Sequence, residues 1–491
     1  MQNEKAKINL LSFKGNNKIL HLSWFAFFTS FFVWFNHAPL MAFIRDDIGL
    51  TKQEVATILI LNVALTIPAR VLIGMFVDRF GPRLIYSLLL FISALLCFGF
   101  ALADSFETLA LFRFLLGFSG AGFVIGIRLI SEWFPVKTVG LAEGIYGGWG
   151  NFGSAAAAMI LPGVALAIGG EDGWRYAVAI TGIIALIYAF IFYHNARNTP
   201  KGATYFKPKK SGAMEISTVG DFFLYMIMKM PLFLALALLT WKLSPANLNM
   251  LSDNVCVGIY IGLLIAFAYQ LYHIYEVNKI VFGKGVEEIQ QYSFKQVALL
   301  SLAYMVTFGS ELAVVSILPI YFMDIFNLSA VHAGFIAASF AFMNLLARPI
   351  GGLFSDKIGR KKILLVLLVG VSIGYFIMSQ IDPSWPIALA VVSTMFCSFF
   401  VQAGEGAVFA TVPLIKRRMT GQISGMVGAY GNVGAVCLLT LYSFVRVEIF
   451  FIFIAVSSII LTLLIAIFMS EPKGHMAEVQ DDGTIELIKV S

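Results

Sequence analysis

The chain has 491 residues, of which 59% are hydrophobic and only 13% are charged, and it carries a net charge of +6. Soluble domains of average composition carry about 25% charged residues, so this chain cannot cover itself with polar surface in water. The balance excludes soluble enzymes, nucleic-acid binders and secreted disulfide scaffolds. The four cysteines lie inside apolar runs without paired spacing, which predicts neither a disulfide framework nor a metal site.

Apolar segments long enough to cross a bilayer recur along the whole chain. A membrane-spanning helix needs about 20 mostly apolar residues, and two sets of six such segments are expected. They cover residues 20–44, 55–78, 84–103, 107–133, 139–162 and 173–194, then 297–322, 333–355, 363–381, 387–412, 423–445 and 449–469. The fold class is therefore an all-α polytopic membrane protein, with one half at 1–194, a second half at 297–470 and a tail at 471–491.

A linker at 195–296 separates the halves and contains two further apolar stretches, 222–241 and 255–275. The first of these carries Lys229 and Pro231, so a position in the membrane interface is the alternative to a full span. A single span would invert the second half in the membrane against its charge pattern, so a single span is disfavoured. Two spans are favoured over none.

The distribution of lysine and arginine predicts the orientation, because cytoplasmic loops carry an excess of both. With the N-terminus inside and both linker stretches spanning, 24 of the 34 basic residues fall in cytoplasmic segments. Four fall outside, and six lie within apolar segments. Both termini, and with them the tail, are therefore expected on the cytoplasmic side.

Two sequence patterns repeat between the halves. The pattern Gly74–Arg83 returns as Gly352–Lys361, and the glycine-rich pattern Gly144–Gly153 returns as Gly425–Gly434 at nearly the same offset. Matching sites at a nearly constant offset are difficult to obtain by chance. The chain is therefore interpreted as a duplicated unit of six spans.

Each half carries one arginine deep within a span, and these two residues, Arg70 and Arg348, are separated by the same offset as the first repeated pattern. An arginine at the bilayer centre costs about 2.5–3.5 kcal/mol on insertion scales. In the functional interpretation the two guanidinium groups line a central cavity and bind a planar oxyanion, to which each fork donates two parallel hydrogen bonds. In the structural alternative a buried carboxylate neutralises each arginine. The same two helices carry no acid at a comparable depth, which favours function.

Other polar residues within the spans are candidates for the same site. Asn151 and Asn432 occupy matching positions of the glycine-rich repeat, and their amides are costly in hydrocarbon without a partner. Ligand contact or hydrogen bonding between the halves is expected of them. Tyr304, Phe308 and Glu311 share one helical face. An ionisable group in a span is functional by default, and Glu311 is interpreted either as a proton site or as a fixed counter-charge to the arginines.

The paired Gly-x-x-x-Asp-Arg/Lys-x-Gly loops resemble the signature loop of the major facilitator superfamily, whose members contain two six-helix halves. Within it, the chain resembles the nitrate/nitrite porter family, especially its cyanobacterial-type nitrate permeases. The resemblance implies twelve core helices, to which the linker adds two hydrophobic helices. The motifs that carry it, besides the two repeats, are Trp34–Pro39, Asp47–Thr51, Gly120–Pro135 and Thr307–Ser310.

The resemblance also implies roles for single residues. In this family two arginines hold the substrate and two phenylalanines sandwich its plane, and the matching positions here are Arg70, Arg348, Phe123 and Phe308. Tyr304 and Asn151 match polar contacts, whereas Asn432 matches the second signature and is expected to act more in the helix interface. The residues expected to gate transport in the two signature loops are Asp78, Arg79, Arg83, Asp356, Lys357 and Arg360.

The implied function is a secondary active transporter that takes up nitrate, and also nitrite, across the plasma membrane by alternating access. An empty site with Arg70, Arg348 and ionised Glu311 has a net charge of +1, which nitrate reduces to zero. A proton on Glu311 would restore it, so proton-coupled symport is expected, with a nitrate/nitrite antiporter as the alternative. No enzymatic activity, cofactor or nucleic-acid partner is expected, and a monomer is expected to work with the anion, protons and the lipid bilayer.

Overall fold

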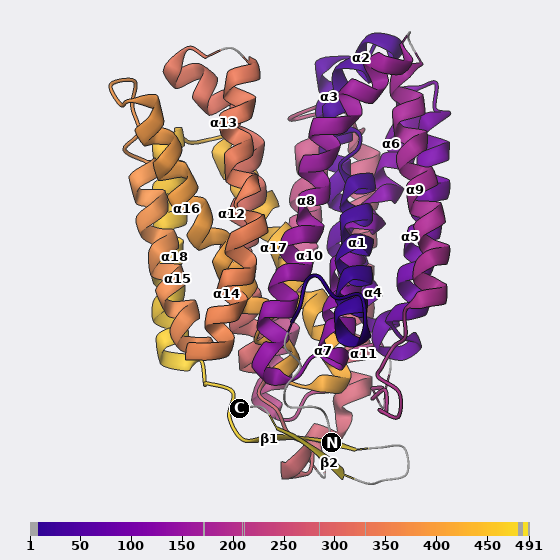
Figure 1. The fold of residues 1–491 in the computed structure, drawn as a ribbon, viewed down its shortest axis with the longest axis vertical. Helices are drawn as coiled ribbons and strands as arrows, with labels where there is room; N and C mark the ends of the chain where they lie inside the picture. The colour runs from indigo at the N-terminus through magenta and orange to yellow at the C-terminus, as the bar shows by residue number, and fades with distance from the viewer. Residues whose placement is uncertain are drawn as a thin grey trace.

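The computed structural model describes residues 8–169, 172–208, 210, 212–283, 285–328, 330–479 and 485–489. In this part of the chain, fourteen helical segments are long and apolar enough to cross a membrane. Figure 1 shows two helical bundles side by side, the first half in indigo to magenta and the second in orange to yellow. The expected all-α polytopic fold with two six-span halves and two additional helices is confirmed.

Several spans of the first half consist of two consecutive helices. The first span joins α1 and α2 through the short helix η1 (Ala38–Leu40), the second joins α3 and α4 at Leu65, and the fourth joins α6 and α7 through η2 (Gly117–Ala121). The helices of this half are α1 (Gly15–Trp34), α2 (Met41–Ile48), α3 (Lys52–Ala64), α4 (Thr66–Phe80), α5 (Pro82–Ala101), α6 (Phe106–Leu116), α7 (Gly122–Trp133), α8 (Val136–Ile168) and α9 (Gly173–Asn195).

The second half repeats this plan. Its second span is also divided, because α13 and α14 meet at Met343. Leu65 and Met343 occupy the same position relative to the deep arginine that follows each of them. The helices are α12 (Phe294–Phe326), α13 (Ala330–Phe342), α14 (Asn344–Ile358), α15 (Arg360–Met378), α16 (Ile387–Phe409), α17 (Thr420–Tyr442) and α18 (Val447–Phe468), with the short turns η5 (Val412–Leu414) and η6 (Arg417–Met419) before α17.

Glycine makes the two repeated loops possible. Gly81 separates α4 from α5 with φ 88°, and Gly359 separates α14 from α15 with φ 129°. Residues with a Cβ rarely adopt these positive φ values, so the glycine of the repeated motif lets the chain reverse directly between two spans. The aspartate that precedes this glycine in each motif is thereby held at the end of its helix, facing the other half.

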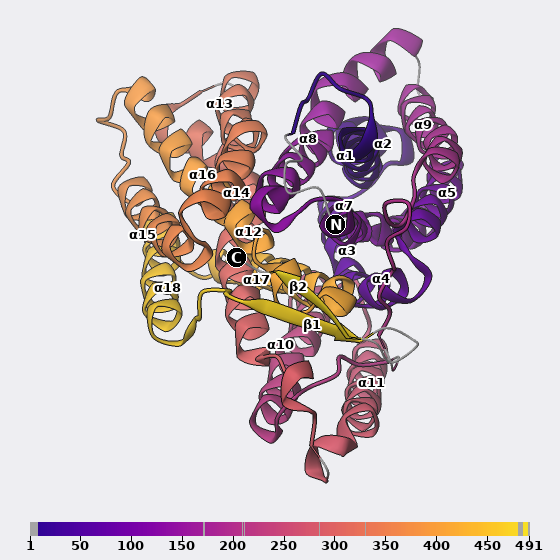
Figure 2. The same cartoon turned by 60° about the horizontal axis from the view of Figure 1, so that its bottom comes forward.

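The linker forms two long helices, α10 (Val219–Leu243) and α11 (Asp253–Asn278), as expected. Helix α10 packs against α17 and α12, where the Tyr430 hydroxyl donates to the Met228 carbonyl at 2.6 Å. Helix α11 packs mainly on α10 and leaves most of its apolar surface exposed. Pro231 lies within α10 without ending it. Figure 2 shows this pair on the outside of the two bundles.

The tail, for which the sequence predicts no secondary structure, contains a β-hairpin. Strands β1 (His475–Val479) and β2 (Ile485–Lys489) pair antiparallel, with His475 opposite Lys489. This hairpin lies across the end of the molecule that carries both chain termini (Figure 2), here called the terminal end. The Lys416 ammonium donates to the Ala477 carbonyl at 2.8 Å, and the Arg418 backbone donates to Glu478 at 3.2 Å. The apolar pattern of the tail does not reveal this hairpin, because its contacts with Lys416 and Arg418 depend on the packing of the spans.

Candidate substrate site between the two halves

Arg70 lies on α4 and is completely buried. Its Nε donates to the Gly120 carbonyl at 3.2 Å, and its Nη1 donates to the Gly428 carbonyl at 2.6 Å, across the boundary between the halves. Its Nη2 has no hydrogen-bond partner in the described part of the chain. Among the described residues, no carboxylate forms an ion pair with this guanidinium, so no acid compensates its positive charge directly.

Arg348, the repeat partner of Arg70, lies on α14 and is also buried. Its Nη2 lies 3.4 Å from Glu311 Oε2 and forms a second ion pair with Glu405 Oε2. Arg348 is therefore paired with buried acids although its own helix carries none at a comparable depth, and one of them is Glu311, the counter-charge that the sequence suggests. The acids come from α12 and α16, so comparison along the helix of the arginine alone could not reveal them.

The expected phenylalanines lie beside both arginines. The guanidinium carbon of Arg70 is 6.0 Å from the Phe123 ring centroid and 5.1 Å from that of Phe308. The corresponding distances for Arg348 are 5.9 and 5.7 Å. The Tyr304 ring is parallel to both phenylalanine rings, with centroids 6.3 Å from Phe123 and 4.9 Å from Phe308. The five side chains from both halves therefore form one cluster.

The two repeat asparagines have different surroundings. Asn151 on α8 donates to Glu311 Oε1 at 3.3 Å and so links the two halves. Asn432 on α17 is fully buried, and neither the oxygen nor the nitrogen of its amide group has a hydrogen-bond partner among the residues that the structure describes. The sequence predicts that Asn432 acts in the helix interface, but its side chain forms no hydrogen bond there with the described residues.

Each glycine-rich helix allows the arginine-bearing helix of the opposite half to pack closely against it. A Cβ at Gly428 would lie 3.2 Å from Arg70 Cδ, and a Cβ at Gly147 would lie 3.2 Å from Arg348 Nη1. Both distances are shorter than ordinary van der Waals contact. Small residues of this kind allow helices in membranes to approach closely. Each half therefore supplies one arginine and the glycine surface that receives the arginine of the other half.

The first signature loop binds the opposite half through Asp78. Its two carboxylate oxygens accept the backbone N–H groups of Gly421 and Gln422 at 2.9 and 2.8 Å, at the start of α17. A negative charge is favourable at a helix N-terminus. Asp78 also pairs with Arg128 at 3.0 Å, and Arg128 pairs in addition with Glu132, four residues further along α7.

The second signature loop makes the mirror contact. Asp356 accepts the backbone N–H groups of Gly140 and Leu141 at 3.0 and 2.8 Å, near the start of α8. It also pairs with Arg360, whose Nη2 donates to the Val136 carbonyl at 2.9 Å. The two aspartates thus close the terminal end symmetrically.

The other residues expected in the gates make no hydrogen bond to the opposite half among the described residues. Arg79 and Lys357 are exposed, and Arg79 lies over the ring of its neighbour Phe80. Arg83 donates to the Tyr193 carbonyl at 2.6 Å, within its own half. Of the six expected gating residues, Asp78, Asp356 and Arg360 are those with hydrogen bonds between the halves in the described structure.

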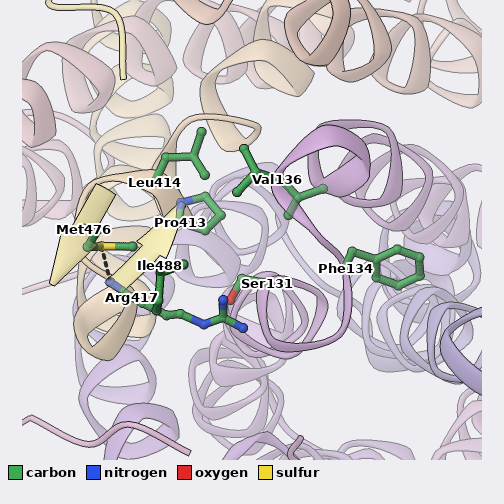
Figure 3. A pocket seen from close by; sticks show the side chains of 9 residues that line it. Ser131, Phe134, Val136, Pro413, Leu414, Arg417, Met476 and Ile488 are labelled. Atoms are coloured by element: carbon green, nitrogen blue, oxygen red, sulfur yellow. Dashed lines mark hydrogen bonds between the residues drawn. The ribbon is translucent and has the colours of Figure 1, made fainter. Parts of the chain in front are cut away.

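A pocket at the terminal end lies where the halves and the hairpin meet (Figure 3). Arg417 donates its backbone N–H to Met476 of β1 at 3.2 Å, and its side chain pairs with Glu132 of the first half at 3.1 Å. The pocket is lined by Ser131, Phe134, Val136 and Val139 of the first half, Pro413, Leu414 and Arg417 of the second, and Met476 and Ile488 of the hairpin. The hairpin therefore covers the closed gate.

Sequence reasoning did not assign three residues of the cluster. Glu405 pairs with Arg348, and Asn344 donates to Glu311 at 2.5 Å. Phe409 packs edge-on against Phe123, with ring centroids 4.5 Å apart. The isolated glutamate in the apolar run of α16 was the signal available for Glu405, because ionisable residues in spans are rare.

Two arginines buried between duplicated six-helix halves, above a gate that both halves build, define a transporter-type membrane fold. The sequence model of the family described as Major Facilitator Superfamily matches residues 23–283 and 300–486 of this chain. The fold resembles that of the proton:xylose symporter XylE, with a TM-score of 0.61 and 15% identity over 93% of this chain and 96% of that one. The fold also resembles that of the human organic anion transporter MFSD10, with a TM-score of 0.61 and 11% identity over 92% of this chain and 100% of that one.

Relatives at higher identity narrow the family. The chain is 47% identical to the nitrate/nitrite transporter NrtP of a Picosynechococcus species, over 96% of each chain. It is 44% identical to the protein of the same name from Nostoc punctiforme, over 95% of each chain. A high affinity nitrate transporter of Arabidopsis thaliana is 30% identical over 86% of this chain and 73% of its own. The chain belongs to the nitrate/nitrite porter family of the major facilitator superfamily.

Proposed function

We propose that the protein takes up nitrate, and also nitrite, across the plasma membrane by alternating access and in symport with protons. The observation that carries this proposal is the position of Arg70 and Arg348. One comes from each half, and both guanidinium groups lie within 6.0 Å of the same two phenylalanine rings. The names of the relatives, nitrate/nitrite transporters, support the same substrate.

The chemistry of the cluster suits a small planar anion. Aromatic faces attract cations, so Phe123 and Phe308 hold the guanidinium groups and do not themselves attract the anion. Arg70 Nη2 is buried without a partner, and a fork of this kind donates in its own plane to an oxyanion. Beside flat aromatic rings, planar nitrate would fit better than tetrahedral phosphate or sulfate.

Alternating access requires a gate that opens and closes at each end. The two aspartate contacts close the terminal end, whereas the ribbons of the two halves diverge toward the opposite end (Figure 1). The excess of lysine and arginine near the terminal end supports a cytoplasmic position for both termini. The conformation described here is then closed to the cytoplasm, and a monomer contains the whole route.

Transport by purified protein in liposomes tests this function. We expect nitrate accumulation when the outside is acidic, and a loss of transport in Arg70→Lys, because a lysine cannot donate to Gly428 and to the anion in one plane. Arg45→Lys, an exposed change outside the site, is the matched control. Normal affinity in Arg70→Lys would refute the two-arginine site.

Exchange is the alternative mode of transport. A relative in Thermus thermophilus that is 25% identical carries the name probable nitrate/nitrite antiporter. Liposomes loaded with nitrite separate the two modes. Nitrate entry that requires internal nitrite and moves no protons would refute symport, whereas entry into empty liposomes that follows the pH gradient supports it.

A further inference from the structure

Two carboxylates share one arginine in the buried cluster. Arg348 contacts both Glu311 and Glu405, and the side chains of all three are at most 4% exposed. Arg70 binds two backbone carbonyls, and none of the ion pairs in the described chain includes it. With all four groups ionised, the cluster of Arg70, Arg348, Glu311 and Glu405 therefore contains two positive and two negative charges.

This balance changes the electrostatics of anion binding. With Glu311 alone the empty site would carry +1, but Glu405 reduces the net charge to zero. A monovalent anion would then bring an uncompensated negative charge into a buried region, which is strongly unfavourable. In addition, Arg348 cannot give its Nη2 fully to the anion while Glu405 holds it. A proton on either carboxyl group removes the first obstacle, and a proton on Glu405 removes both.

The hydrogen bonds distinguish the two carboxylates. Glu311 Oε1 accepts from Asn344 at 2.5 Å and from Asn151 at 3.3 Å, so amide donors from both halves satisfy its ionised form. Glu405 has Arg348 as its partner, and within the described ranges no donor contacts its Oε1. If Glu405 became neutral, the ion pair with Arg348 would be the one contact it lost. Glu311 is better arranged as the fixed counter-charge.

We propose that Glu405 is the proton site that couples transport, and that it competes with the anion for Arg348. The inference rests on the proposed function. A proton from the side opposite the terminal end forms an O–H bond on Glu405, and the ion pair with Arg348 is released. Arg348 then donates to the anion together with Arg70. When the terminal end opens, anion and proton leave, and the ion pair forms again.

The helices packed around α16 contain few other titratable groups near this cluster. Glu405 is the one charged residue of α16, and the acids and bases at the ends of neighbouring helices belong to the gates or to the membrane surface. The interior groups are Glu311 and Tyr304 on α12, Arg348 on α14, Tyr375 on α15, Glu143 and Tyr146 on α8 and Arg70 on α4, with His332 near the outer end of α13.

Proton uptake on nitrate binding tests the inference directly. Purified protein in weakly buffered detergent solution is mixed with nitrate, while a pH dye reports protons and calorimetry reports binding. We expect the wild type to take up about one proton per nitrate, and its affinity to fall up to about tenfold per pH unit as the pH rises. Glu405→Gln should bind nitrate without proton uptake and with little pH dependence. In liposomes it should exchange nitrate but not accumulate it.

Two further variants complete the experiment. Glu311→Gln should retain the proton uptake, because Glu405 still pairs with Arg348, and Glu107→Gln, an exposed carboxylate on α6, should behave as the wild type. Proton uptake that persists in Glu405→Gln, or disappears in Glu311→Gln while binding remains, would overturn the assignment. Nitrate binding by the wild type without proton uptake would also overturn it and leave the proposed substrate intact. Absence of nitrate binding by the wild type would instead refute the proposed function.

Discussion

Replacing Asp78 by asparagine should open the terminal end without altering the substrate cluster. Asp78 is fully buried, and its two oxygens accept the backbone N–H groups of Gly421 and Gln422. An asparagine keeps one acceptor oxygen and turns an amide NH₂ group toward the other N–H. The change therefore removes one charge-assisted bond between the halves, weakens the second, and leaves Arg128 with Glu132 as its remaining acid.

The size of the effect follows from these contacts. A hydrogen bond to a charged group contributes about 1.5–3 kcal/mol. Because the bonds to Gly421 and Gln422 cross between the halves, their loss counts against the closed conformation alone. The ratio of closed to open molecules should therefore fall roughly 10- to 150-fold.

Spin labels at Lys137→Cys and Lys362→Cys, exposed residues at the starts of α8 and α15, report this equilibrium through their distance distribution. The background must lack the four native cysteines. Asp78→Asn should add a population at longer distance, and Asp104→Asn, an exposed change, should not. An unchanged distribution in Asp78→Asn, with the protein folded, would refute the view that this aspartate holds the gate closed.

Three further changes have smaller expected effects. Gly428→Ala should weaken nitrate binding several-fold in calorimetry, because the new methyl group would lie 3.2 Å from Arg70 Cδ and would displace the guanidinium. Tyr430→Phe should lower the thermal unfolding midpoint slightly, because the lost bond from Tyr430 to the Met228 carbonyl contributes about 0.5–1.5 kcal/mol. Glu471→Gln should loosen the tail and raise its protease sensitivity, because the Glu471 carboxylate accepts two backbone N–H groups at the start of α15.

The sequence predicts the fold because a bilayer imposes strong rules. Each span must be about 20 residues long and hide its own backbone polar groups, so apolar runs alone reveal the helices. The constant offset between the repeated motifs then predicts that Arg70 and Arg348 occupy equivalent positions. The repeat does not reveal the helix breaks at Leu65 and Met343, since neither position carries a proline or glycine.

Contacts between helices that are distant in sequence are harder to predict from the sequence. Glu405 and Arg348 lie on different helices, so no spacing rule pairs them. The aspartates of the two signature loops bind N–H groups in the opposite half of the chain, and the motif identifies the aspartates but not their partners. The hairpin depends on Lys416 and Arg418, whose positions follow from the packing of the spans.

The duplicated chain separates a symmetric task from an asymmetric one. Both halves close the terminal end with the same device, an aspartate at the N-terminus of a helix in the opposite half, so opening requires both contacts to break. The substrate cluster is different, because both halves supply an arginine but the two acids that face Arg348 come from the second half alone. An anion bound to Arg70 therefore meets no competitor, whereas on Arg348 it must displace Glu405. Coupling between anion and proton transport follows from this asymmetry. A variant with the acid moved beside Arg70 should keep the gate contacts but change which arginine binds the anion first.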